Sequence, residues 1–375
     1  MSGLYLHIPF CQKACHYCDF HFSTTLGQME AMVNAMCREM EMRVEGRNRP
    51  QMSTVYFGGG TPSILPEKLL NKLFEAIHRH YEVDPGAEVT LEANPDDMSD
   101  SMISAWNQLG INRLSIGLQS SHNERLTWMN RIHSAEEGRH AVQQAQDAGI
   151  ENISLDLMYN FPGSTIQELE EDIHSMLSLS PKHISAYGLT IEPQTVFGKR
   201  FKKGELQPLP EESAVQQFQY VRKRLAESGF EGYEISNFGQ PGFFAVHNTN
   251  YWFQKPYDAI GPGAHGFDGM QRTENLPNNA LYIKSILEKG ELYQKVEILS
   301  DVDRANEHIL TRLRTKWGLD LDELSGISGI VLDQIRQEEL NAFEKEALIY
   351  RQNQFVFLTE EGKLLADRIA MELMV

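Results

Sequence analysis

The chain has 375 residues, of which 41% are hydrophobic and 23% charged, and its formal net charge at pH 7 is −18. This length suits one large domain with a smaller one, and the acidic balance disfavours a nucleic-acid partner, because phosphate binding relies on Lys and Arg. No stretch reaches the roughly 20 apolar residues of a membrane span, and the start of the chain lacks the features of a secretory signal, so we expect a cytoplasmic protein.

Short strand-like runs alternate with amphipathic helical runs through the first half of the chain. Strands are predicted at 4–8, 54–57, 88–92, 113–118, 152–157 and 183–189, and helices at 28–44, 66–80, 99–109, 135–148 and 165–179. Strands that are joined by helical crossovers pair in parallel, and six such units are fewer than the eight of a closed barrel. We therefore predict an α/β protein with an open, partial (β/α)6 TIM-like barrel.

The pattern changes in the second half. A loop is predicted after Pro193, with the short basic run 199–203 on a solvated face, followed by a helix at 211–228. Residues 229–269 show no clear periodicity of apolar residues. A helical pattern returns from 278, and a β-hairpin is predicted near 349–358, before a last helix at 360–374. We expect a barrel at 1–210, a loop-rich region packing on it at 211–277, and a small helical, winged-helix-like domain at 278–375.

Three of the four cysteines, Cys11, Cys15 and Cys18, have the spacing C-x3-C-x2-C. Cytosolic chains rarely keep structural disulfides, so this cluster indicates metal or redox chemistry. Three thiolates in one loop after the first strand suit an iron–sulfur cubane with one iron left open. The alternative is a zinc knuckle, for which His16 or His21 would supply the fourth ligand.

Tyr5, His7 and this cysteine loop resemble the radical-SAM superfamily, whose signature is the same spacing. Three further sequence motifs are similar to those of its oxygen-independent coproporphyrinogen III oxidase-like branch. They are YFGGGTPS at 56–63, EANP at 92–95 and RLSIGLQS at 113–120. The similarity covers nearly the whole chain. It implies a [4Fe–4S] cluster on the three cysteines, S-adenosylmethionine (SAM) chelating the fourth iron, a 5′-deoxyadenosyl radical after reductive cleavage, and an electron donor for the cluster.

The resemblance and the position of polar residues at predicted strand ends together indicate a SAM site. Its members are Tyr5, Gly59, Gly60, Thr61, Glu92, Gln119, Arg131 and Asp156. The glycines would let the methionyl group approach the backbone, and in the family Glu92 holds the ammonium. Arg131 suits a carboxylate, and Asp156 suits the ribose hydroxyls.

Phe20 is a departure from the oxidases of this branch, which continue the loop as C-x3-C-x2-C-x-C and carry an extension before the first strand. The HemW-type haem chaperones share both departures and have an H-N-x-x-Y-W motif, which is present here from His247 to Trp252. This resemblance implies that haem is bound, with His247 as a ligand, and is passed to apo-haemoproteins, membrane-associated ones included.

Three functions stay open from the sequence: a haem chaperone, an anaerobic coproporphyrinogen III oxidase that forms protoporphyrinogen IX, and a radical-SAM enzyme with an unrelated substrate. Whether the chain is an enzyme and how it oligomerises are also open. The stretch 261–266 satisfies G-x-G-x-x-G but lacks the strand-to-helix context of a dinucleotide site, so we interpret it as a packed loop near the barrel mouth. His265 within it is a candidate second haem ligand.

Overall fold

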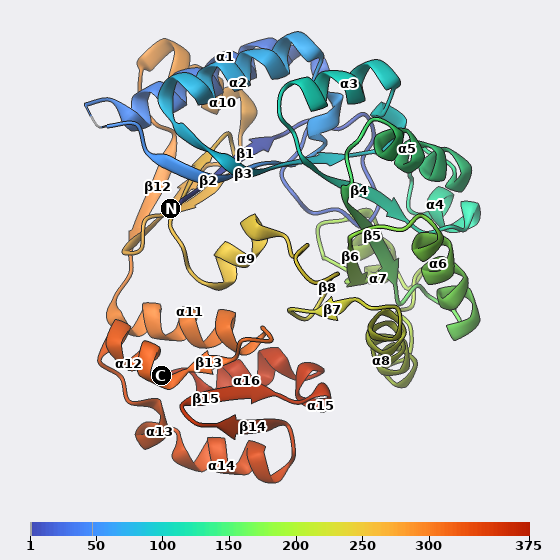
Figure 1. Ribbon diagram of the computed structural model, residues 1–375, viewed down its shortest axis with the longest axis vertical. Coiled ribbons are helices and arrows are strands. Elements are labelled where there is room, and N and C mark those ends of the chain that lie inside the picture. The colour runs from blue at the N-terminus through green and yellow to red at the C-terminus, as the bar shows by residue number, and fades with distance from the viewer. Residues whose placement is uncertain (1, 47) are drawn as a thin grey trace.

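The structure, a computed structural model, describes residues 2–46 and 48–375. Across these residues, twelve strands form one sheet in the order β12-β11-β10-β9-β1-β2-β3-β4-β5-β6-β8-β7 (Figure 1). Its centre is a run of parallel strands in chain order: β1 (Ser2–Ile8), β2 (Gln51–Gly59), β3 (Glu82–Ala93), β4 (Arg113–Gln119), β5 (Asn152–Tyr159) and β6 (His183–Gly188). The six predicted strands and their parallel order are confirmed.

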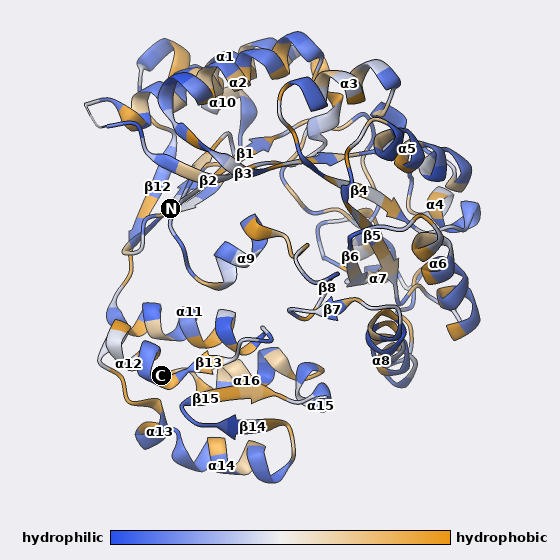
Figure 2. Cartoon of the chain, viewed as in Figure 1, coloured by the Kyte–Doolittle hydropathy of each residue, from blue (hydrophilic) through white to orange (hydrophobic). Residues whose placement is uncertain are grey.

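Helices connect these strands and cover the outer face of the curved sheet (Figure 1). They are α1 (Met29–Val44), α2 (Glu67–His80), α3 (Asp100–Gln108), α4 (Asn123–Trp128), α5 (Ala135–Asp147) and α6 (Ile166–Ser178), with short 3-10 turns η1 (Leu26–Gln28), η2 (Pro62–Ile64) and η3 (Pro95–Asp97). Capping boxes at Ser134 and Thr165 start α5 and α6. Figure 2 shows hydrophilic residues over much of the outer helices α5 and α6. The partial (β/α)6 barrel is confirmed, although α4 was not predicted.

The two faces of the parallel strands differ in polarity. Apolar side chains such as Leu4 and Phe57 are fully buried in the main core, which includes residues of α1 and α2. The alternate side chains, on the concave face, are polar. One row runs through strands β1 to β5 as Tyr5, Tyr56, Thr90, Arg113 and Asn152, each opposite the next in register. A closed barrel fills this space with aliphatic residues, so a polar interior indicates a place for polar ligands.

Helix α7 (Val196–Lys202) corrects the predicted loop after Pro193. Thr195 caps its first turn by accepting from Gly198 N at 3.0 Å, and Phe197 is fully buried against Trp128, with ring centroids 4.0 Å apart. The basic run therefore lies on and just beyond a packed helix. Next come α8 (Glu211–Glu227), which confirms the predicted helix, and the strands β7 (Glu231–Gly232) and β8 (Asn237–Gly239), which extend the sheet beyond β6.

The sheet also extends on its other side. Helix α9 (Val246–Trp252) precedes β9 (Tyr257–Ile260), which pairs in parallel with β1, and β10 (His265–Phe267), β11 (Gln271–Asn275) and β12 (Gln294–Ile298) follow in antiparallel order. Between β11 and β12 lie α10 (Asn279–Lys284) and the π-helix η4 (Ser285–Lys289). The expectation of continuous helix from 278 is wrong at β12, whose structure depends on pairing with β11 and not on a local pattern.

The last part of the chain has its own apolar core, with Ile309, Leu340 and Val356 buried in it. Its elements are α11 (Asp301–Leu313), β13 (Leu319–Asp320), α12 (Leu321–Ser328), α13 (Leu332–Ile335), α14 (Gln337–Lys345), β14 (Ile349–Gln352), β15 (Phe355–Leu358), α15 (Glu360–Lys363) and α16 (Ala366–Leu373). The helical character and the hairpin are confirmed, whereas the boundaries at 210 and 277 stay predictions. None of the helices in the described part of the chain is both long and apolar enough to cross a bilayer.

Candidate metal and cofactor site

The cysteine loop follows β1 and is fixed by hydrogen bonds from distant segments. Cys11 N donates to Ser23 O at 3.1 Å and closes the base of the loop. His16 N donates to Met129 O at the end of α4, and His16 O accepts from Phe197 N in α7, both at 3.0 Å. These backbone hydrogen bonds hold the loop against α4 and α7.

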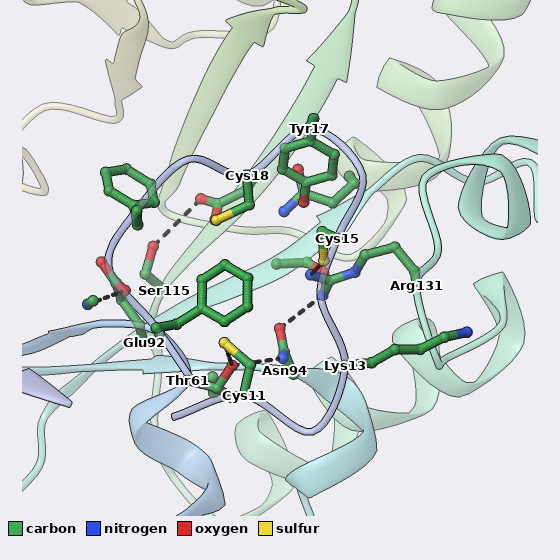
Figure 3. Close-up of a pocket in the computed structure, with 18 of the residues that line it drawn as sticks. Cys11, Lys13, Cys15, Tyr17, Cys18, Thr61, Glu92, Asn94, Ser115 and Arg131 are labelled. Carbon is green, nitrogen blue, oxygen red and sulfur yellow. Dashed lines mark hydrogen bonds between the residues drawn. The ribbon is translucent and has the colours of Figure 1, made fainter. Parts of the chain in front are cut away.

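The thiols of Cys11, Cys15 and Cys18 line a cavity of about 390 Å³ at the carboxyl ends of the strands (Figure 3). The Thr61 hydroxyl donates to Cys11 Sγ at 3.4 Å, and Arg131 Nη1 donates to Cys15 Sγ at 3.6 Å. Burial raises the pKa of Cys11 to about 11 and that of Cys18 to about 12, so both are thiols at neutral pH, and a metal must displace their protons.

The zinc alternative required His16 or His21 as a fourth ligand. His16 Nδ1 is hydrogen-bonded to Trp128 O at 2.9 Å, and His21 Nε2 to Asn279 Oδ1 at 2.8 Å. Each of these bonds uses one of the two ring nitrogens, so they do not exclude either histidine as a zinc ligand.

Two carboxyl groups, Glu92 and Asp156, line the same cavity. Glu92 accepts from the Tyr56 hydroxyl at 2.8 Å and from Gly59 N at 3.2 Å, and Asp156 accepts from the Ser115 hydroxyl at 3.4 Å. Burial raises the pKa of Glu92 to about 7 and that of Asp156 to about 6. A cationic ligand would favour the ionised forms of both groups.

Arg131 lies on the opposite wall and is held in one orientation. Its Nη2 donates to Asn94 Oδ1 and to Gly117 O, each at 2.7 Å. Its Nε is buried and makes no hydrogen bond within the described residues. Because Arg131 lines the cavity, its guanidinium is suited to a carboxylate ligand.

The glycines at the end of β2 have a packing reason of their own. A Cβ on Gly60 would lie 2.6 Å from Phe10 O, and one on Gly59, whose φ is +108°, would lie 2.6 Å from the His7 ring. Gly60 N also donates to Ile8 O at 2.9 Å. The glycines therefore let the cysteine loop approach β2, in addition to leaving the cavity open.

Further cavity residues were missed by the sequence reasoning: Lys13, Tyr17, Phe22, Asn94, Ser115, Gly117, Met158 and Tyr187. Several share a strand with a predicted residue at an even spacing: Gly117 stands two positions and Ser115 four positions before Gln119, and Met158 stands two positions after Asp156. Since alternate residues of a strand share a face, this period could have found them. Gln119 itself has φ of +69°, a left-handed conformation that is strained for glutamine and that occurs where a site fixes the backbone.

Tyr5 and His247 lie deeper in the barrel and not on the cavity wall. The Tyr5 hydroxyl is hydrogen-bonded to His7 Nδ1 at 3.1 Å. The His247 side chain is buried, its Nδ1 bonding the Thr54 hydroxyl at 2.8 Å and its Nε2 the Tyr251 hydroxyl at 2.7 Å. Burial also lowers the pKa of His247 to about 3. Both nitrogens of the neutral ring are therefore occupied.

The stretch 261–266 is a packed turn, with Gly261 N donating to Glu39 Oε2 at 2.9 Å. A Cβ on Gly261 would lie 2.5 Å from His7 O, which explains this glycine by close packing on β1. His265 is exposed in β10. The predicted packed loop is confirmed, and the role of His265 as a haem ligand stays a prediction.

The open parallel sheet and the thiol-lined cavity at its strand ends are the features of a radical-SAM protein. Residues 5–176 match the family model described as the radical SAM superfamily, and residues 299–365 match that of the HemN C-terminal domain. The chain is 35% identical to the heme chaperone HemW of Bacillus subtilis over 98% of both chains, and 32% identical to that of Lactococcus lactis over 98% of this chain and 96% of the relative. It therefore belongs to the HemW family, in the coproporphyrinogen oxidase-like branch of the superfamily.

A solved structure of coproporphyrinogen III oxidase (HemN) from Escherichia coli, described as a radical SAM enzyme, has the same fold. It matches with a TM-score of 0.86 over 100% of this chain and 90% of that one. The sequence identity is 21%, so this likeness concerns the fold alone.

Proposed function

We propose that this protein is a haem chaperone, which binds haem and delivers it to apo-haemoproteins. The full-length similarity to proteins named heme chaperone supports the proposal. The observation that carries the choice between chaperone and oxidase is Phe20, which stands where the oxidases resembled by this chain have a fourth cysteine. Its ring is 68% exposed at the cavity, a position suited to contact with a flat apolar ligand.

The proposal includes a [4Fe–4S] cluster on Cys11, Cys15 and Cys18, with SAM in the adjoining cavity. Soft thiolates suit iron–sulfur chemistry, and the cavity volume of about 390 Å³ lies in the range of small-molecule sites. In the family, cluster and SAM when bound supply reductive cleavage of the sulfonium, which requires an external electron donor. The protein groups bind and orient these cofactors and limit access of water.

Individual roles follow from the geometry of the cavity. Arg131 offers its guanidinium to the SAM carboxylate, and Glu92 offers an acceptor to its ammonium. The remaining contacts are assigned to Gly59, Gly60, Thr61, Gln119 and Asp156. Tyr5 is assigned a positioning role, because it contacts residues next to the cavity. Its ring packs beside Gly58, 3.1 Å from where a Cβ on that glycine would lie, and its hydroxyl is hydrogen-bonded to His7.

His247 can bind haem iron only if its hydrogen bond to Thr54 or to Tyr251 opens, because these bonds use both ring nitrogens. We assign His247 as a haem ligand in such an opened state. Recipients, membrane-associated haemoproteins among them, are part of the same proposal. A cytoplasmic location is supported by four free cysteines, which a reducing compartment preserves.

Haem transfer tests the function directly. Protein loaded with haemin is mixed with an apo-haemoprotein. The recipient's absorption spectrum should then develop faster than in a control that contains only free haemin, at the low concentration of free haemin present in the loaded sample. Coproporphyrinogen III should remain unchanged when it is incubated anaerobically with reductant, SAM and cluster-loaded protein. Formation of protoporphyrinogen IX would overturn the chaperone assignment in favour of the oxidase.

A pair of variants tests His247. His247→Ala should alter the Soret band and weaken haemin binding, whereas Tyr251→Phe removes the competing hydrogen bond and keeps the imidazole. The account predicts haemin binding by Tyr251→Phe at least as tight as that of the unmodified chain. Identical Soret spectra for all three proteins would remove His247 from the haem site.

A further inference from the structure

Helix α7 and the residue after it carry a basic run that contrasts with the rest of the chain. Residues 195–203 contain four cations and no carboxylate, whereas the whole chain has 34 Lys and Arg against 52 Asp and Glu. The three lysines of the run are exposed and its arginine is partly exposed; they are Lys199, Arg200, Lys202 and Lys203. A cluster of one sign creates a local potential that differs from that of the whole molecule.

The four cations have no carboxylate partner in the part of the chain that the structure describes. On the next helix, by contrast, Lys223 Nζ lies 3.9 Å from Glu227 Oε1. Cations near a helix C-terminus interact favourably with the helix dipole, but two of them four positions apart, as Lys199 and Lys203 are, repel each other. The run therefore holds more positive charge than α7 itself requires.

Two exposed apolar side chains lie among the cations. Positions 196, 199, 200 and 203 have the spacing i, i+3, i+4, i+7, so they share one face of the helix. Val196 on this face is 37% exposed, and Phe201, between two cations in the chain, is 47% exposed. An apolar contact inside a charged rim is the usual arrangement of a protein interface. We refer to Val196 and residues 199–203 as the basic surface.

The buried side of α7 forms part of the support of the cysteine loop. Phe197 N donates to the carbonyl of His16, the residue after Cys15, at 3.0 Å. The Phe197 ring belongs to an apolar cluster with Met158, against which Tyr17 packs, and both of these residues line the cavity. The outer side of α7 and the loop are thus separated by about one helix diameter, roughly 10 Å.

We propose that the basic surface is the docking site of the electron donor, a small acidic protein that carries single electrons on a flavin or an iron–sulfur centre. The inference rests on the cluster of the proposed function, because reduction of the cluster is the step that needs a donor. One electron leaves the reduced donor, which is thereby oxidised, and enters the cluster. No bond forms or breaks in this step.

Charge directs such a donor to α7. A net charge of −18 repels an acidic protein from most of the surface. Exposed charges are largely screened beyond about 8 Å at physiological salt, so a local group of unpaired cations can still attract it. Nucleic acid and anionic membranes would also be attracted by four cations, but neither exchanges electrons with a cluster. Contact between α7 and the cysteine loop therefore favours a redox protein.

Docking can be measured on the cluster-free chain, with oxidised flavodoxin and an acidic [2Fe–2S] ferredoxin as the two probes. At least one of them should bind, and the affinity should fall as the salt concentration rises. Lys199→Glu combined with Lys203→Glu should weaken binding by about tenfold or more, chiefly through slower association. Lys289→Glu combined with Lys345→Glu is the matched control and should bind normally, since both lysines are exposed and also lie in the last turns of helices.

Two further variants separate docking from damage to α7. Lys199→Gln combined with Lys203→Gln removes charge without placing carboxylates at the helix C-terminus. It should weaken binding in the same direction but by less. Phe201→Ala should speed dissociation of the donor, because it removes the apolar contact inside the rim.

Anaerobic stopped-flow absorbance of the cluster-loaded chain measures the transfer itself. With either donor reduced beforehand and kept below saturation, the variant with glutamates at 199 and 203 should be reduced about tenfold more slowly than the matched control. Excess dithionite, a small-molecule reductant, should reduce both proteins to the same extent.

The outcomes separate this inference from the proposed function. A loaded chain that dithionite reduces but that binds neither donor overturns the docking site and leaves the cluster in place. Equal donor binding by the charge variant and the control overturns it as well. So does binding of the basic surface to phosphatidylserine vesicles and to neither donor, which would assign it to an anionic membrane. A chain that takes up no iron overturns the cluster, and the donor role with it, whatever the docking experiment shows.

Discussion

The two ends of the barrel interior are both lined by polar side chains, but they differ in whether these side chains border the cavity. At the carboxyl ends of the strands, Glu92, Arg131 and Asp156 line it, and the pKa of Glu92 is raised to about 7. The opposite end, the floor of the barrel, is formed around Glu88 and His247. There both ring nitrogens of His247 are hydrogen-bonded, and the Glu88 carboxylate accepts from the first two amides of α9. Groups at the first end border the cavity, whereas those at the second hold α9 against the sheet in this structure.

The inward-facing polar side chains of the strands therefore have different roles at the two ends of the barrel. Polar groups that satisfy each other rigidify a core, while those aimed into a cavity act on what enters it. Changes at the cavity should therefore alter cofactor binding with little loss of stability, and changes at the floor should do the reverse.

Cys15→Ala should abolish retention of the cluster, because only two of the three thiolate ligands of the cubane remain. Iron per chain after anaerobic reconstitution should fall to background, while circular dichroism stays unchanged, since backbone bonds fix the loop. Cys37→Ala, which alters the one cysteine outside the loop, is the matched control and should keep its iron. Full iron retention in Cys15→Ala would contradict the assignment.

Arg131→Gln should weaken SAM binding to the cluster-loaded protein by about 10- to 100-fold, the loss expected for a charge-assisted hydrogen bond of about 1.5–3 kcal/mol. Isothermal titration under anaerobic conditions measures the affinity. Arg139→Gln, at an exposed position of α5, should bind SAM normally. Equal affinities for all three proteins would remove Arg131 from the site.

His247→Ala should lower the free energy of unfolding by about 2–3 kcal/mol, through a cavity and the unpaired hydroxyls of Thr54 and Tyr251. Urea denaturation of the cluster-free chain measures the loss. SAM affinity of the loaded variant should change by less than about threefold. A loss of SAM binding as large as that of Arg131→Gln would show that floor and cavity are one coupled unit.

Glu92→Gln should give the smallest effect on stability, with a distinctive pH dependence. Since the folded-state pKa of Glu92 is raised to about 7, the folded state holds its proton more tightly than the unfolded state, and stability declines as pH rises from about 4.5 to about 7. The variant removes this decline and should be more stable by about 1–2 kcal/mol at pH 8, with little difference at pH 4.

Thermal unfolding of the cluster-free proteins at the two pH values measures this change. SAM binding by loaded Glu92→Gln should be weakened, because the ammonium loses an anionic acceptor. A stability gain that is the same at both pH values would contradict burial of the charge as its cause.

The parallel strands could be predicted because their apolar faces give a local signal, as Leu4, Leu6 and Ile8 do in β1. The cysteine loop and half of the residues that line the cavity were predicted, from spacing, from position at strand ends and from the family resemblance. Strand β12 and helix α7 were not, because the first depends on pairing with a separate segment and the second on burial of Phe197.

The hydrogen bonds of His247 were equally out of reach, since its partner Thr54 is 193 residues away in the chain. Proximity of this kind is set by the fold and leaves no local mark in the sequence. The glycines at 58–60 show the same limit. Their number was clear from the sequence, but the contact of Gly60 with the Phe10 carbonyl, which requires a residue without a Cβ, became visible only in three dimensions.

The central claim is that three thiolates hold a cubane whose remaining iron faces the SAM cavity. Electron paramagnetic resonance of anaerobically reconstituted and reduced protein, recorded with and without SAM, tests it most directly when metal content is measured on the same sample. The account predicts about four iron atoms per chain and a cluster signal that changes when SAM is added. Zinc in place of iron, or a cluster signal identical in both samples, would contradict it.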